Sequence, residues 1–355
     1  MSTYEAAGVS IEAGDKAVEL MKVWIEKARR PEMLGGIGGF AGLFDASALK
    51  AYERPILATS TDGVGTKVAI AQALDKHDTI GHDLVGMVVD DLVVCGAEPL
   101  FMTDYIATGK VVPERIAAIV QGIAEACVLA GCALSGGETA EHPGLLGPDE
   151  YDVAGAATGV VDAANLLGAN LVRPGDVVIA MASSGLHSNG YSLVRHVLLT
   201  PSSSGAKRSL TEHVDDLGRT LGEELLEPTR IYAKACLDLA RRTGTHAMSH
   251  ITGGGLAANL ERVLPEDVTV TLDRNTWALP PIFSLVAETG NVARADLEKT
   301  LNCGVGMVSL TPAQDADAAI AILAEHDIDA WVAGTVAAAG DSADRGVVRL
   351  VGDYA

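Results

Sequence analysis

The sequence is poor in aromatic residues and cysteines, and it has no long apolar run. Aromatic residues make up 4% of the 355 residues, so a hydrophobic core must be built from Val, Leu, Ile and Ala. The five cysteines form no CxxC pair, which argues against a zinc site or a disulfide framework and favours a reducing compartment. No run of about 18 apolar residues can span a bilayer, and no apolar leader follows Met1. We therefore expect a cytoplasmic protein that is neither secreted nor inserted in a membrane.

Basic residues are also scarce relative to acidic ones. The chain has 26 Lys and Arg against 47 Asp and Glu, which gives a formal net charge of -21 at pH 7. This charge repels nucleic acid and anionic membrane surfaces, so we expect neither as a partner. A phosphate-bearing ligand would need local attraction from backbone N–H groups, a few basic side chains and a divalent cation.

The length and the pattern of elements predict a two-domain α/β protein. A leading segment, 1–54, contains a helix over 14–30 and a glycine-rich flap over 35–42. A domain over 55–168 follows, and the remainder, 169–355, forms the second domain, with a polar surface loop over 200–211. The hydrophobic patterns predict helices over 79–95 and 113–130, and they predict strands near 56–60, 100–107, 151–161, 176–182, 246–251, 268–272, 303–310 and 329–336.

A glycine turn carries an acidic and a basic residue in Asp62-Gly-Val-Gly-Thr-Lys67. Glycines let a backbone approach phosphate oxygens, Asp62 is suited to bind Mg2+, and Lys67 supplies a positive charge. The spacing differs from that of a Walker A loop, so a P-loop fold is not implied. The alternative is an ordinary turn with a helix-capping Asp62.

The expected helix over 79–95 carries Asp83, Asp90 and Asp91 among apolar residues. Asp83 and Asp90 share a face, whereas Asp91 lies about 100° further round the helix. A carboxylate in an apolar helix costs several kcal/mol unless it is paired or bound to metal. The alternative is that these residues lie on a solvated face.

Two further polar segments point to ligand binding. Glu138 follows a short apolar strand, at a position where strand ends often present ligand groups, and His142 nearby is more typical of a surface. The loop of Ser183, Ser184, Gly185, His187, Ser188, Asn189 and Gly190 precedes a helix from Tyr191 and offers N–H donors to an anion, although an ordinary capped helix start is the alternative. Asp104 interrupts an otherwise apolar strand, and Thr252-Gly-Gly-Gly255 is another turn suited to anions.

Taken together, these segments resemble the phosphoribosylformylglycinamidine cyclo-ligase family, also called aminoimidazole ribonucleotide synthetase. The likeness covers almost the whole chain, and it runs through Gly35-Gly-Ile-Gly-Gly-Phe40, Asp62-Gly-Val-Gly-Thr-Lys67, Gly136-Gly-Glu-Thr-Ala-Glu141, the loop from Ser183 to Arg195, Glu227-Pro-Thr-Arg-Ile-Tyr232, Thr252-Gly-Gly-Gly255 and Asn302-Cys-Gly-Val-Gly-Met307. The resemblance implies a two-domain subunit with mixed sheets, whose N-terminal sheet completes a barrel across a homodimer. It also implies ATP-dependent ring closure of formylglycinamidine ribonucleotide in purine biosynthesis, with release of ADP and phosphate.

The resemblance also implies roles for individual residues. ATP would be bound by Gly38, Gly39, Asp62, Gly63, Gly65, Thr66 and Lys67, with the flap as its cover. Mg2+ would be bound by Asp62, Asp91 and Glu138. The ribonucleotide would be bound by Gly137, Glu138, Thr139, Ser183, Ser184, Gly185, Ser188 and Asn189, with its phosphate in the 183–190 loop. The catalytic candidates are Lys67, Asp104 and His187, and His187 is either a general acid or base or only a donor to phosphate.

One departure from the family pattern matters, because Asp90 stands where the family usually has Asn. The added carboxylate either binds metal or raises local repulsion. The sequence leaves two kinds of rival function open. One is another ATP-using enzyme of the same superfamily, such as thiamine-monophosphate kinase, selenophosphate synthetase or the hydrogenase-maturation dehydratase. The other is a catalytically silent nucleotide-binding protein.

Overall fold

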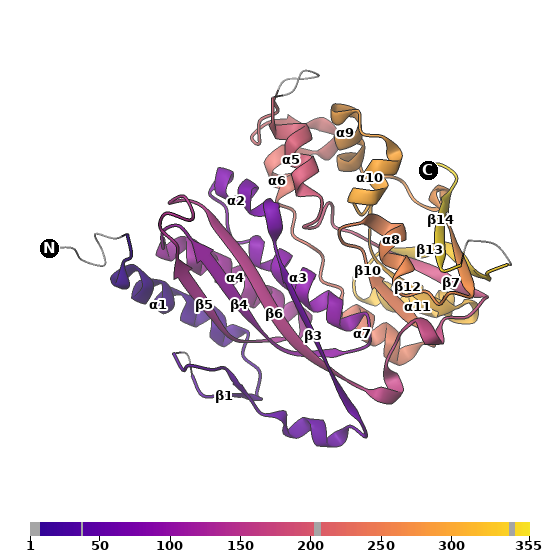
Figure 1. The fold of residues 1–355 in the computed structure, drawn as a ribbon, viewed down its shortest axis with the longest axis horizontal. Coiled ribbons are helices and arrows are strands. Elements are labelled where there is room, and N and C mark those ends of the chain that lie inside the picture. Colours follow the sequence, from indigo (N-terminus) through magenta and orange to yellow (C-terminus); the bar gives the residue numbers. More distant parts are fainter. Residues whose placement is uncertain (1–7, 37, 202–206, 341–344) are drawn as a thin grey trace. The chain divides into compact units, whose positions relative to one another are not determined.

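A computed structural model of the chain describes residues 8–36, 38–201, 207–340 and 345–355. The chain divides into two compact units (Figure 1). The first contains Met1–Leu92 and Ala97–Ala164, and the second contains Val93–Gly96 and Asn165–Ala355. Among the described residues, no helix is long and apolar enough to cross a membrane.

The first unit is built on a four-stranded mixed sheet. Its strands are β3 (Pro55–Gly63), β4 (Glu98–Thr108), β5 (Ala133–Glu141) and β6 (Tyr151–Asp162). The order across the sheet is β3-β6-β4-β5, so the strand that comes last in the sequence lies inside the sheet. β4 and β5 are parallel, and the other pairs are antiparallel. A two-stranded ribbon of β1 (Met33–Leu34) and β2 (Leu43–Phe44) flanks the predicted flap.

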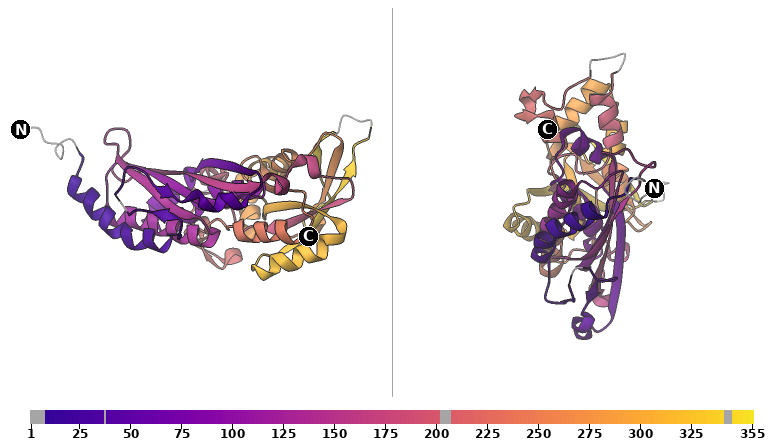
Figure 2. Two further views of the ribbon diagram at one scale, coloured as in Figure 1. Left: turned by 90° about the horizontal axis from the view of Figure 1, so that it is seen from below. Right: turned by 90° about the vertical axis from the view of Figure 1, so that its left-hand side faces the viewer.

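Helices cover one side of this sheet. α4 (Pro113–Ala130) connects the parallel strands β4 and β5, and α1 (Ile11–Lys27) packs against it (Figure 2). α4 begins with proline at a position where a missing N–H costs nothing, and Gly131 ends it with a φ of 77°, which is left-handed. These two signals explain why the predicted span of 113–130 is confirmed.

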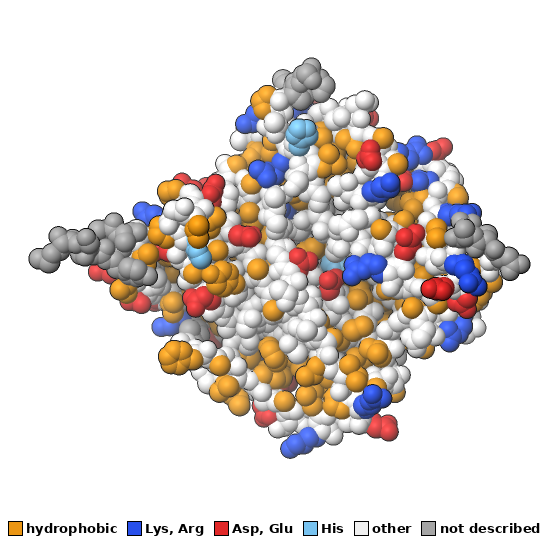
Figure 3. Space-filling model, viewed as in Figure 1, with side chains coloured by type: hydrophobic (Ala, Val, Ile, Leu, Met, Phe, Trp, Pro, Cys, Tyr) orange, Lys and Arg blue, Asp and Glu red, His pale blue; other side chains and the backbone are white. Residues whose placement is uncertain are grey.

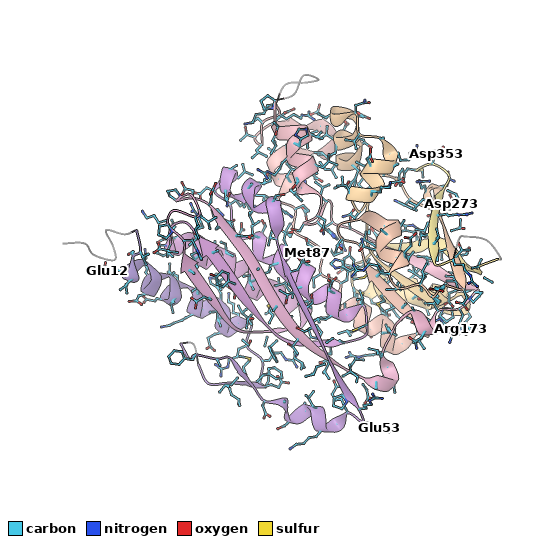
Figure 4. The ribbon with its side chains drawn as sticks, viewed as in Figure 1. Glu12, Glu53, Met87, Arg173, Asp273 and Asp353 are labelled. Atoms are coloured by element: carbon cyan, nitrogen blue, oxygen red, sulfur yellow. The ribbon has the colours of Figure 1, made fainter. Side chains whose placement is uncertain are left out.

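The other helices of this unit are α2 (Val68–Leu74) and α3 (Ile80–Val93). α3 is apolar on nearly every side, and the leucine, valine and methionine side chains along it are buried. Met87, labelled in Figure 4, is 2% exposed. A helix that is apolar all round belongs in a core, so α3 is the internal support of the sheet.

The second unit has a six-stranded mixed sheet with the order β10-β12-β7-β13-β11-β14. The strands are β7 (Asp176–Ala182), β10 (Ala247–His250), β11 (Val268–Asp273), β12 (Val305–Pro312), β13 (Ala330–Ala338) and β14 (Val347–Val351). Only β11 and β14 are parallel among the pairs of this sheet. Its core is formed by alternating side chains such as Val268, Val270 and Leu272.

The remaining elements of the second unit are helices and one small ribbon. The helices are α5 (Tyr191–Leu199), α6 (Leu221–Leu225), α7 (Ala233–Arg242), α8 (Gly255–Glu261), α9 (Pro281–Gly290), α10 (Arg294–Thr300) and α11 (Ala316–Glu325), and the ribbon pairs β8 (His213–Val214) with β9 (Arg219–Thr220). Part of the expected loop over 200–211 lies outside the described residues. The predicted α/β fold with mixed sheets in two units is confirmed, and the barrel across a dimer stays a prediction.

Candidate functional site

The first unit contains a cavity of about 710 Å³. Its walls come from α1, from the flap and from the adjacent strands β4 and β5. Of the predicted site residues, it brings together Gly38, Gly39, Asp104, Gly137, Glu138 and Thr139. The predicted turn from Asp62 to Lys67 does not line it.

Asp104 points from β4 toward the side of the sheet covered by helices. Met102 and Ile106, two positions away on either side, point the same way and are both 0% exposed. The Asp104 carboxyl fills the space where Gly137 would carry a side chain, because a Cβ added at Gly137 would lie 2.3 Å from Asp104 Oδ1. Burial raises the pKa of Asp104 from 3.8 to about 7.

The flap is anchored at both of its ends. Arg29 donates hydrogen bonds from Nη2 to the carbonyl oxygens of Met33 and Gly35, at 3.2 Å and 2.7 Å. Gly42 packs so closely on β5 that an added Cβ would lie 2.2 Å from the Ser135 carbonyl oxygen. Between these anchors the described residues of 35–42 form no helix or strand, as the glycine content predicted.

The register of the sheet separates the residues expected to bind Mg2+. Asp62, Gly155, Asp104 and Gly137 form one row across the four strands, and their side-chain positions face the helices. Glu138 is the next residue on β5, so it faces the opposite side, level with Tyr105. Asp62 and Glu138 therefore point to opposite faces of the sheet.

A ready-made metal cluster is absent from the described residues, since no group of three His, Cys, Asp or Glu side chains is placed to hold an ion. Asp62 and Asp91 are both exposed. The carboxylates of Asp62 and Glu138 each accept one hydrogen bond from the next backbone N–H, at 2.7 Å and 3.0 Å. One expectation needs correction, because Glu138 lies inside β5 rather than after a strand end.

Lys67 lies in the interior rather than at a ligand-accessible surface. Its Nζ is 2.7 Å from Asp83 Oδ1, and both side chains are 0% exposed. The pair joins the end of the glycine turn to α3. This position does not fit the expected direct contact of Lys67 with phosphate. The alternative that the aspartates of this helix lie on a solvated face is wrong for Asp83 and Asp90, because both are 0% exposed.

In the second unit, the loop over 183–190 is held by several hydrogen bonds. The Ser183 hydroxyl donates to the Gly185 carbonyl at 2.9 Å, and the Ser184 hydroxyl donates to the Pro228 carbonyl at 2.6 Å. Asn302 donates to the Gly185 carbonyl at 2.9 Å. These bonds fix the loop. Because both serine hydroxyls already donate their protons, they can only accept hydrogen bonds from a ligand.

His187 is buried at the turn of this loop with a φ of 59°, which is left-handed. Its Nε2 accepts a hydrogen bond from the Ser184 backbone N–H at 3.2 Å, so Nε2 carries no proton and the ring is neutral. Gly306 is required beside it, because an added Cβ would lie 2.5 Å from the His187 ring. A neutral ring whose Nε2 is occupied leaves only Nδ1 for proton donation.

Two glycine-rich loops meet in this unit. Asn189 Oδ1 accepts a hydrogen bond from the Gly253 backbone N–H at 3.1 Å, which ties the 183–190 loop to the turn that precedes α8. Asn259 donates to the carbonyl oxygens of Thr252 and Gly253, both at 3.2 Å, and stabilises that turn. The sequence singled out both loops but gave no signal that they are adjacent.

Several polar residues of these sites have no counterpart in the sequence-based predictions. A smaller cavity of about 160 Å³ is lined by Ser183, Ser184 and Gly185 together with Asp216 and Glu224. In the first unit, Glu141 accepts hydrogen bonds from the backbone N–H groups of Ser10 and Val111, at 3.0 Å and 2.6 Å. Such contacts join residues far apart in the sequence, and spacing alone carries no sign of them.

Comparisons of fold define the class of the protein. The family model described as AIR synthase related protein, N-terminal domain, matches residues 44–161, and its C-terminal counterpart matches 173–345. A thiamine-monophosphate kinase from Stenotrophomonas maltophilia K279a has a TM-score of 0.65 at 19% identity, covering 95% of this chain and 97% of that one. Hydrogenase maturation protein HypE has a TM-score of 0.64 at 17% identity, covering 92% of each chain. At these identities the likeness shows a shared fold.

Comparisons of sequence then narrow the class. A phosphoribosylformylglycinamidine cyclo-ligase from Geobacillus kaustophilus is 50% identical over 334 residues, which are 94% of this chain and 95% of that protein. One from Brevibacillus brevis is also 50% identical, over 335 residues and the same shares. The chain belongs to the phosphoribosylformylglycinamidine cyclo-ligase family. The family predicted from the motifs is confirmed.

Proposed function

We propose that this protein uses ATP to close the imidazole ring of formylglycinamidine ribonucleotide, giving aminoimidazole ribonucleotide, ADP and phosphate. The observation that carries the proposal is the 50% identity, over 94% of the chain, to relatives named for this activity. In this reaction ATP phosphorylates the formyl oxygen, a ring-forming nitrogen attacks the formyl carbon, and phosphate leaves. Positioning and charge neutralisation supply most of the catalysis in such steps.

We assign ATP to the cavity of the first unit, where the flap residues Gly38 and Gly39 line one wall. Glycines at this wall let phosphate oxygens approach the backbone. At the edge of the sheet, ATP is contacted by the turn of Asp62, Gly63, Gly65 and Thr66, through the Asp62 carboxylate. Lys67 stabilises this turn through its buried ion pair with Asp83.

Mg2+ fits this unit as an ion shared between protein and nucleotide. Mg2+ is commonly held by one or two carboxylates together with phosphates and waters, so a preformed cluster of three protein ligands is not needed. Asp62 and Asp91 offer exposed carboxylates. Glu138 faces the other side of the sheet and fits a second ion or the substrate. When bound, the ion neutralises charge on the transferred phosphoryl group.

We assign the ribonucleotide phosphate to the second unit, and we keep Gly137, Glu138 and Thr139 of the first unit as substrate-binding candidates on the family resemblance. The joined loops at Asn189 and Gly253 fit its phosphate, because backbone N–H groups of glycine turns bind anions. Ser188 and Asn189 lie at this junction. The smaller cavity at Ser183, Ser184 and Gly185 offers mainly acceptors and fits hydroxyl or nitrogen donors of the substrate. His187, neutral in this arrangement, serves as a donor through Nδ1.

Among the described residues, no helix covers one face of the sheet of the first unit, and we propose that a second copy covers it. Leu57 is 60% exposed and Tyr105 41% exposed on this face. Figure 3 views this side, and hydrophobic side chains gather over its lower part. Covering it would complete the barrel expected for a homodimer.

In this scheme residues 55–168 serve ATP binding and dimerisation, 1–54 contribute the flap, and 169–355 form the C-terminal domain. The free state of all five cysteines fits a cytoplasmic location.

An assay of ATP hydrolysis with and without formylglycinamidine ribonucleotide tests the function. We expect ADP release that depends on the ribonucleotide and matches aminoimidazole ribonucleotide formation one to one. A silent nucleotide-binding protein would release no ADP under either condition. ADP release with thiamine monophosphate instead would favour the kinase rival.

A further inference from the structure

Asp104 brings a carboxyl group into a largely apolar part of the cavity wall. Ala17, Val120 and Leu134 also line the cavity. Met102 and Ile106, its neighbours on the same face of β4, are fully buried. Among the described residues, no side chain donates a hydrogen bond to Asp104, and no cation pairs with it. The Asp104 side chain is partly buried, so a ligand that fills the cavity removes water from its carboxyl and must itself supply a hydrogen-bond donor.

The carboxyl is also held in a fixed place. It occupies the position that a side chain at Gly137 would fill, with Oδ1 2.3 Å and Oδ2 2.9 Å from that Cβ position. The side chain therefore cannot turn toward solvent without losing its packing over the backbone of β5. A fixed acceptor facing a cavity is suited to recognise one donor in one direction.

The charge of Asp104 decides which part of ATP can lie beside it. A triphosphate is repelled by a carboxylate, and Arg29, the basic side chain that lines this cavity, already donates hydrogen bonds to the carbonyl oxygens of Met33 and Gly35 in the flap. The adenine base is neutral and planar, and its exocyclic amino group is a hydrogen-bond donor. An apolar wall with one acceptor is the usual composition of a site for such a ligand.

We propose that Asp104 accepts a hydrogen bond from the exocyclic amino group of adenine and thereby selects ATP. The proposal rests on the assignment of ATP to this cavity. The base lies between α1 and β5, beside the Asp104 carboxyl. Asp104 is then a specificity-determining residue, in place of the catalytic role expected from the sequence. Its raised pKa is consistent with this role, because both the neutral and the ionised carboxyl accept an N–H donor.

Equilibrium binding tests the contact directly. The probes are ATP and purine riboside triphosphate, which lacks only the exocyclic amino group. We expect the unaltered protein to prefer ATP by roughly 10- to 100-fold, the value of a hydrogen bond to a desolvated carboxyl. Asp104→Leu should bind both nucleotides alike. Asp104→Asn keeps a carbonyl acceptor and should retain most of the preference, which guards against misfolding of the Leu variant.

The matched control is Glu26→Gln, which changes another carboxylate of the same cavity. It should leave the ratio of the two affinities unchanged. An Asp104→Leu variant that still prefers ATP by tenfold would overturn the proposal. So would an Asp104→Asn variant with an unchanged affinity ratio whose kcat falls a hundredfold, because that result would place Asp104 at the reacting atoms.

The outcomes also separate this contact from the proposed reaction. Failure of the unaltered protein to form aminoimidazole ribonucleotide would refute the function. A preference for ATP that depends on Asp104 would survive that result, because it is measured by binding alone.

Discussion

Lys67 and Asp83 form an ion pair that is closed off from solvent, with 2.7 Å between Nζ and Oδ1. The pair fastens the end of the glycine turn to α3, the most buried helix of the first unit. Asp62, at the start of that turn, is exposed. The turn that begins at the exposed Asp62 is thus fastened by a buried charge pair at its other end, five residues further along the chain.

The first prediction concerns this pair. Lys67→Ala leaves a buried carboxylate without its partner, so the free energy of unfolding should fall by about 3–5 kcal/mol. Turnover should fall at least tenfold, because Asp62 loses its support. Denaturant unfolding and steady-state kinetics check the two effects. Lys67→Met combined with Asp83→Leu removes both charges and should recover most of the stability, and a double variant no more stable than Lys67→Ala would contradict a paired role.

The second prediction concerns pH and Asp104. Its pKa is about 7 in the folded chain against an ordinary value of 3.8, so between these values the folded chain binds more protons than the unfolded one. The free energy of unfolding contributed by this group therefore falls as pH rises from about 4 to about 7. Asp104→Asn removes this effect, so its gain in Tm over the unaltered protein should be larger at pH 8 than at pH 5. Asp78→Asn, at an exposed position of the same unit, is the control, and an equal gain at both pH values would refute the raised pKa.

The third prediction tests the contact between Gly137 and Asp104. Gly137→Ala would place a methyl group 2.3 Å from Asp104 Oδ1 and displace the carboxyl. We expect the affinity for ATP to fall roughly tenfold, as for loss of a hydrogen bond to a charged group. Gly136→Ala is the matched control, because nothing lies within 4 Å of its added Cβ. Equal ATP affinities for the two variants, measured by titration calorimetry, would show that the position of Asp104 is unimportant.

The fourth prediction concerns the divalent cation. With a net charge of -21 the chain cannot hold ATP by charge alone, so ring closure should require Mg2+ or Mn2+ and stop in excess chelator. Activity should return on adding either ion. Full ATP-dependent ring closure in chelator would show that Asp62, Asp91 and Glu138 do not serve a metal.

The fifth prediction concerns Asp90, which stands where the family usually has Asn. Asp90 is 0% exposed, whereas its neighbour Asp91 is exposed and better placed to meet an ion. Asp90→Asn should therefore retain activity with an equal or lower Mg2+ requirement. A Mg2+ titration of both proteins at saturating ATP is the measurement. A severalfold higher requirement for the variant would mean that Asp90 itself binds metal.

Much of the fold was predictable because the signals are local. The proline and glycine that bound α4, and the apolar runs of β7 and β11, are read directly from neighbouring residues. The segment Ala133–Glu141 was harder, because its glycines and glutamates have low strand propensity. It forms an edge strand because β4 supplies a hydrogen-bonding partner along its whole length.

The candidate site was predictable as a set of segments but not as an arrangement. The sequence picked out Asp62, Asp104 and Glu138, yet only the sheet register shows that Glu138 faces the opposite side from the other two. The partner of Lys67 was also beyond prediction, since Asp83 was open to several interpretations. Pairings of this kind depend on how helices and strands pack, which local spacing does not specify.

The position of β6 has a consequence for how the protein is made. β6 is the last strand of the first unit in the sequence, yet it lies between β3 and β4. While the chain is being synthesised, β3 has no partner in this sheet until residues 151–162 have left the ribosome. The row that aligns Asp62 with Asp104 cannot exist before that moment, because Gly155 joins them. From Gly63 to Asp162, a little over a quarter of the 355 residues, the nascent chain thus carries β3 without its partner, and aggregation competes with folding during this interval.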